Sequence, residues 1–94
     1  MDSDRQIMLR ELDRISIRLG SLNLDRLARM EQPVHDCARV ISESSKGGAQ
    51  ELPRVGPSAY VAQITVVTQD LLMMNPEGNE VAAKALTELR RALP

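Results

Sequence analysis

The sequence predicts an all-α protein of four amphipathic helices, packed as a helix bundle or in a coiled-coil-like assembly that we expect to be oligomeric. Three observations predict this fold class. Apolar residues recur at alternating spacings of three and four residues, the period of a helix that buries one face. Residues 45–58 are rich in Gly and Pro and divide the chain in two. Tyr60 is the only aromatic residue, so the core must be built from aliphatic side chains, as in helix pairs.

The expected organisation is one helical domain, because 94 residues lie near the lower limit for a self-sufficient core. This domain covers residues 1–94 and consists of two helical hairpins joined by the linker at 45–58. The four helices are expected at about residues 3–20, 24–44, 59–75 and 79–93.

The first helix has an apolar stripe roughly 80° wide. Five residues form this stripe: Met8, Leu12, Ile15, Leu19 and Leu22. Charged residues lie opposite this stripe, and Glu11 and Arg14, which are three positions apart, can pair weakly. Asp2 or Ser3 offers an oxygen to cap the first turn, and Gly20 offers a C-terminal stop.

The second helix has a stripe that keeps its phase across Pro33. Its members are Leu27, Met30, Val34, Cys37, Ala38 and Ile41. An interior proline costs about 3 kcal/mol and usually breaks or kinks a helix. Because the phase is preserved, we favour one helix over 24–44, kinked near residues 29–33. The alternative is two short helices, with Pro33 opening the second. Asn23 is the expected N-cap.

The third helix, with Ser58 as its expected cap, is apolar on nearly every side. Its main stripe consists of Tyr60, Ile64, Val67, Leu71 and Met74. Several β-branched residues make a strand the competing interpretation, but helical spacing over about sixteen residues favours a helix. The segment from Val55 to Gln69 has no formal charge. We therefore expect this helix to be central, or to be covered by another chain.

The fourth helix follows a turn at residues 75–79. Either Asn75, with Pro76 at the first helical position, or Asn79 can provide its cap. The apolar face of this helix consists of Ala82, Ala85, Leu86, Leu89 and Leu93.

His35 and Cys37 are the only histidine and the only cysteine. On a helix they point about 160° apart, so they cannot form a nucleophile and base pair. The same two residues cannot supply the four ligands of a structural zinc site. Phosphate-binding loops and hydrolase motifs are also missing from the sequence. We therefore expect no enzymatic activity, no metal, no cofactor and no small-molecule substrate.

The net charge of −1 argues against a nucleic-acid partner, which requires clustered Lys and Arg. The alternative function is that of a small DNA-binding regulator, with a helix-turn-helix around residues 10–32. Its second element offers Asn23, Arg26, Arg29 and Gln32, residue types that contact bases or phosphates. Acidic residues in the same segment weigh against this alternative.

The sequence also predicts a soluble, cytoplasmic protein. A single cysteine fits a reducing compartment. The polar start of the chain, MDSDRQ, does not resemble a secretory signal. The longest apolar-rich stretch, residues 59–74, is too short and too polar to cross a bilayer, so we expect no contact with a membrane.

Six apolar residues lie off the main stripes and are the expected partner interface. They are Ile7, Leu9 and Ile17 in the first helix and Val66, Leu72 and Met73 in the third. Methionine-rich surfaces adapt to partners, and exposed apolar patches usually mark interfaces. We expect a non-enzymatic protein–protein interaction module (a small subunit, adaptor or chaperone) that packs against another protein or a second copy. A self-contained four-helix bundle is the competing interpretation.

Overall fold

The computed structural model describes residues 2–44, 52 and 54–94, and in these residues it contains helices and no strand. The α-helices are α1 (Asp2–Ser21), α2 (Leu24–Ala28), α3 (Glu31–Ser44), α4 (Tyr60–Met74) and α5 (Asn79–Ala92). Two short 3-10 helices precede the last two of them, η1 (Pro57–Ala59) and η2 (Pro76–Gly78). The all-α prediction is confirmed, although the described residues form five α-helices rather than four.

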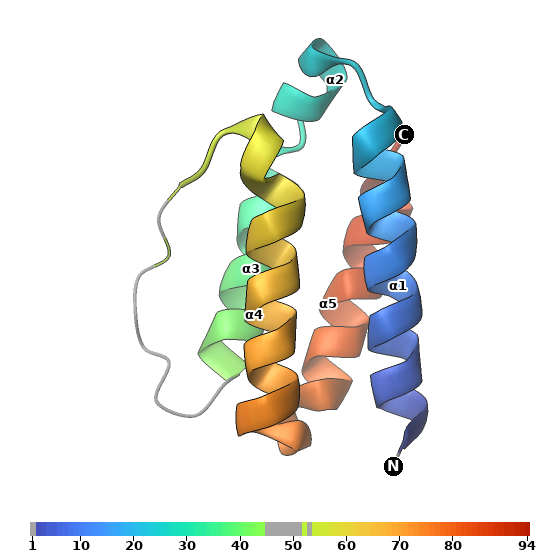
Figure 1. The fold of residues 1–94 in the computed structure, drawn as a ribbon, viewed down its shortest axis with the longest axis vertical. Coiled ribbons are helices and arrows are strands. Elements are labelled where there is room, and N and C mark those ends of the chain that lie inside the picture. The colour runs from blue at the N-terminus through green and yellow to red at the C-terminus, as the bar shows by residue number, and fades with distance from the viewer. Residues whose placement is uncertain (1, 45–51, 53) are drawn as a thin grey trace.

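The four long helices form a bundle in which α1 and α5 run one way and α3 and α4 run the other (Figure 1). α1 packs along α5 and α4, and α3 packs along the same two helices. α1 and α3 therefore occupy opposite corners, as do α4 and α5, while α3 and α4 are neighbours, so the prediction of two packed hairpins is wrong. The reason is the long first connection: α2 crosses one end of the bundle and separates α1 from α3 (Figure 1).

The segment predicted as one kinked helix is two helices, as the alternative interpretation had it, although the second begins two residues before Pro33. α2 ends at Ala28 and α3 begins at Glu31. The first amide of α3 to donate to a carbonyl four residues back belongs to Val34, which bonds to Met30 O at 2.9 Å. Pro33 directly precedes this donor, at a position where an N–H would have no partner within the helix. The phase across Pro33 is preserved because both helices face the same core.

The predicted caps have mixed outcomes. Asn23 does cap α2, because its Oδ1 accepts a hydrogen bond from the Arg26 amide at 2.9 Å. Gly20 does not stop α1, which continues to Ser21. Ser58 lies inside η1, and the residue that precedes α4 provides no side-chain cap. Neither Asn75 nor Asn79 acts as a cap: Asn75 precedes η2 without capping it, and α5 begins at Asn79.

One core joins all four long helices. Most of the predicted stripe residues are buried in it, and Tyr60 is the aromatic among them. Leu12, Leu22, Leu27 and Ala85 are only partly buried. Met74, the last residue of α4, was predicted to be buried but is exposed. Two polar residues are buried with the apolar ones, Glu11 and Thr68.

Polar contacts hold the two parallel helices α3 and α4 together at both ends. At one end, Arg54 pairs with Glu31 at 3.3 Å, which ties the segment before α4 to the first turn of α3. At the other end, Asn75 Nδ2 donates to Ser44 O at 2.6 Å. Most of the predicted linker, residues 45–51 and 53, lies outside the described residues.

Candidate interaction surfaces

His35 and Cys37 do not form a reactive pair in the structure. Cys37 is buried and lies in a groove between α3 and α5. His35 was predicted to be exposed, but it is half-buried, and its Nδ1 is a buried atom with no hydrogen-bond partner among the described residues. Its side of α3 is covered because Val55 and Tyr60 pack beside it. Among the described residues, no three His, Cys, Asp or Glu side chains are grouped so that they could hold a metal ion.

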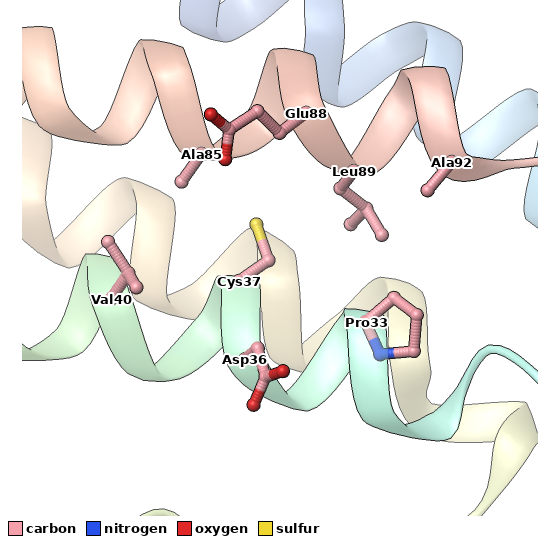
Figure 2. Close-up of a pocket in the computed structure, with 8 residues that line it drawn as sticks. All are labelled: Pro33, Asp36, Cys37, Val40, Ala85, Glu88, Leu89 and Ala92. Atoms are coloured by element: carbon pink, nitrogen blue, oxygen red, sulfur yellow. The ribbon is translucent and has the colours of Figure 1, made fainter.

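The groove between α3 and α5 has a volume of about 190 Å³ (Figure 2). Cys37 points from α3 toward α5, and Glu88 lies on the opposite wall. Burial, and secondly the negative charge of Glu88, raise the pKa of the Cys37 thiol to about 12. The thiol is therefore protonated at neutral pH and is a poor nucleophile. This groove gives no indication of catalytic chemistry.

The outward side of α4 presents a largely apolar stripe, which we call the α4 outer face. It consists of Ala62, Val66, Gln69 and Met73, all exposed. These four residues have helical spacings of four, three and four, and so lie within a stripe about 60° wide. Val66 is 55% exposed and Met73 82%. Three of the four side chains are apolar and none is charged, which is unusual for the solvent side of a helix.

A shallow apolar groove continues the α4 outer face toward the start of the helix. Its volume is about 350 Å³, and it lies between α4 and the segment that leads into it. Its lining residues are Leu52, Val55, Ala59, Ala62, Gln63, Val66 and Val67. Ala62 and Val66 belong to both features, so the groove and the face form one surface without a formal charge.

The six residues of the predicted interface do not form a single patch. Val66 and Met73 lie together on the α4 outer face, while Leu72 is half-buried and packs against the core. Ile7, Leu9 and Ile17 are all exposed on α1. From helix geometry, Ile7 and Leu9 point about 160° apart, and Ile17 points about 80° from each. The structure therefore brings two of the six residues together and leaves the α1 residues as separate exposed side chains.

A second, chemically different feature lies where the C-terminal halves of α1 and α5 run side by side (Figure 1). It is an open hollow of about 620 Å³, which we call the arginine hollow. Six residues line it: Arg14, Ile17, Arg18, Arg90, Arg91 and Leu93. Sequence reasoning missed this feature because its two halves are far apart in the chain and meet only when α1 and α5 pack in parallel.

Glu11 organises one wall of the arginine hollow. This carboxylate was predicted to lie on a charged surface and to pair weakly with Arg14, but it is buried. It accepts a hydrogen bond from Arg90 Nε, and its other oxygen lies 3.5 Å from Arg14 Nη1. The phase of the stripe could have revealed this burial, because Glu11 lies three residues after Met8 and four before Ile15. Its partners Arg14 and Arg90 are thereby fixed in position.

The segment considered for a helix-turn-helix, residues 10–32, contains the end of α1, the short helix α2 and the start of α3. α2 has five residues, less than two turns, so it does not offer the recognition helix that reads a major groove. Arg26 and Arg29 are exposed at this end of the bundle, together with Leu24, which is 74% exposed.

Comparison with known proteins finds no matching family model, curated protein or solved structure. None of the described helices is both long enough and apolar enough to cross a membrane.

Proposed function

We propose that the protein is a non-enzymatic interaction module that binds another protein through the α4 outer face. The observation that carries this proposal is the exposure of Val66 and Met73 on one stripe of α4, whose other two members, Ala62 and Gln69, have no charge. Full burial of a Val or Met side chain contributes about 1.5–3 kcal/mol. A partner that covers both would recover a substantial part of this free energy.

The groove beside α4 supports the same proposal. It places Leu52 and Val55 next to Val66, so a partner can contact two segments of the chain at once. Apolar pockets that accept a partner's side chain are typical centres of protein interfaces. Methionine is also well suited to such a surface, because its unbranched side chain adapts to the shape of a partner.

Aspartate substitutions at two exposed apolar positions test this proposal. Met73→Asp places a charge on the α4 outer face, and Leu9→Asp is the matched control on α1. Neither side chain belongs to the core, so circular dichroism should show unchanged helix content for both. We expect wild type to sediment as a dimer, or to retain a protein partner from a lysate of the source cells. Met73→Asp should abolish this association because it buries an unpaired charge in the interface, and Leu9→Asp should preserve it.

Three results would contradict the proposal. One is a wild-type monomer at micromolar concentration that retains no partner. The second is equal association by wild type and Met73→Asp. The third is loss of association with Leu9→Asp but not with Met73→Asp, which would move the interface to α1.

A further inference from the structure

We propose that the arginine hollow is a second binding site, and that it takes an acidic, amphipathic peptide segment of a partner protein. This site lies on α1 and α5, away from the α4 outer face, and does not depend on the function proposed for that face. Four guanidinium groups gather in the hollow in a chain whose net charge is −1. Such a concentration of positive charge in a slightly acidic protein calls for a physical explanation.

The need to offset the partial negative charges at the helix C-termini explains only part of this positive charge. α1 and α5 end side by side, and positive side chains near helix C-termini offset the partial negative charge there, about half a charge for each helix. Arg18, Arg90 and Arg91 lie in the last turns of these helices. Against the four guanidinium groups stands the single carboxylate of Glu11, which leaves a net charge of +3. The positive charge therefore exceeds what two helix ends and one carboxylate offset.

The four arginines divide into a fixed pair and a free pair. Arg14 and Arg90 are held by Glu11. Arg18 and Arg91 are exposed, and no ion pair involves either of them among the described residues. A guanidinium group binds a carboxylate with two parallel hydrogen bonds, so Arg18 and Arg91 can each bind one carboxylate of a ligand.

Apolar side chains in the hollow indicate that the ligand has an apolar side chain between its two carboxylates. Ile17 is 64% exposed, and Leu93 also contributes to the lining. An acidic helix or extended segment with an apolar side chain between its carboxylates matches both features. Nucleic acid matches less well, because single-stranded binding relies on aromatic stacking and Tyr60, the only aromatic residue, is buried in the core. The hollow, at about 620 Å³, also lies in the usual range of ligand sites.

The test measures binding of a fluorescein-labelled synthetic peptide by fluorescence anisotropy. The probe contains Glu and Leu, with Leu at helical spacings of three and four. The site variant combines Arg18→Gln with Arg91→Gln, and the control combines Arg5→Gln with Arg26→Gln, which removes the same charge elsewhere on the surface. Glutamine keeps a helix propensity close to that of arginine. A second variant, Ile17→Ser, removes the exposed apolar contact without changing any charge.

We expect wild type to bind the Glu/Leu peptide with an affinity that falls as salt is added. The site variant should weaken binding about tenfold or more, since each charge-assisted contact is worth more than a neutral one. The control should stay within about twofold, because it removes only distant surface charges that are largely screened. Ile17→Ser should weaken binding while the salt dependence is unchanged. Met73→Asp should bind the peptide as wild type does, which separates this site from the α4 outer face.

Four results would overturn the assignment. They are the absence of saturable binding by wild type, equal losses in the site and control variants, equal binding of a peptide with Gln in place of Leu, and tighter binding of a single-stranded oligonucleotide of equal charge. The last result would identify a nucleic-acid site instead.

Discussion

α1 and α4 both have large apolar side chains outside the core, but they distribute them differently. On α1, Ile7, Leu9 and Ile17 point in three directions. On α4, Val66 and Met73 share one stripe with Ala62. Scattered apolar residues are ordinary on protein surfaces, whereas gathered ones mark interfaces.

The two helices also differ in how charge contributes to their packing. α1 meets α5 across a seam that contains Glu11, Arg14 and Arg90. α4 has one formal charge, Asp70, which is exposed. The bundle therefore has a strongly charged surface, formed by α1 and α5, and a largely apolar one, formed by α4 and the segment that leads into it.

The largest change in the free energy of unfolding is expected from a substitution of Glu11, in the charged seam between α1 and α5. Glu11→Ala removes a buried carboxylate and leaves Arg90 without its partner. A fully buried pair broken in this way costs about 3–5 kcal/mol, but the side chain of Arg90 is 30% exposed, so we expect about 1–3 kcal/mol. Urea denaturation followed by circular dichroism measures the loss.

The matched control for Glu11 is Asp13→Ala, which removes an exposed carboxylate from the same helix. We expect it to change the free energy of unfolding by less than about 0.5 kcal/mol. If the two variants lost the same stability, the charged seam between α1 and α5 would contribute nothing specific, and the contrast with α4 would disappear.

A change in stability of up to the same size is expected from substitutions of two glycines near the helix ends. A Cβ at Gly78, just after α4, would lie 3.0 Å from Leu71 Cδ1 and 3.1 Å from Ser44 O. Because the second contact is with backbone, Gly78→Ala should destabilise the protein by about 1–3 kcal/mol. A Cβ at Gly20, near the end of α1, would meet nothing within 4 Å. Gly20→Ala should therefore stabilise by up to about 1 kcal/mol.

Thermal unfolding of the two glycine variants checks this expectation. The two changes in Tm should have opposite signs. If Gly78→Ala were as stable as wild type, the end of α4 would not be packed against the end of α3 as closely as the structure places it.

The apolar stripes could be predicted from the sequence because each depends only on local periodicity. Met8, Ile15 and Leu19 keep a helical period and are buried. The break before Pro33 was not predicted: the stripe favoured one kinked helix, and the alternative of two helices is selected only by the hydrogen bonds of the structure. The exposure of Val66 and Met73 agrees with the sequence because both lie off the main stripe of their helix.

The pairing of helices could not be predicted, because four similar stripes can close a bundle in several orders. The arginine hollow depends on this pairing: Arg18 and Arg91 approach each other only when α1 and α5 are parallel neighbours. The half-burial of Leu72 has the same origin, since the neighbours of α4 determine which of its sides are covered. Contacts between segments that are distant in the chain do not change the apolar periodicity of either segment, so periodicity cannot reveal them.

The smallest changes in the free energy of unfolding are expected from the removal of two hydroxyl groups, one in α4 and one in α1. Thr68 in α4 is fully buried, and within the part of the chain that the structure describes its Oγ1 has no hydrogen-bond partner. A buried hydroxyl without a partner costs about 1–3 kcal/mol, and valine has nearly the same shape. Thr68→Val should therefore raise the free energy of unfolding by about 1 kcal/mol. Ser16 in α1 donates to Leu12 O at 2.8 Å, so its hydroxyl is satisfied.

Ser16→Ala provides the matched comparison for Thr68→Val. It loses one hydrogen bond but gains helix propensity, so we expect a change within about 0.5 kcal/mol. Urea denaturation of both variants under the same conditions measures the difference. A loss of stability in Thr68→Val would mean that the hydroxyl has a partner in solution, such as a buried water. The core-facing side of α4 would then include a hydrated polar group. The difference between α4 and α1 would hold only for their exposed sides.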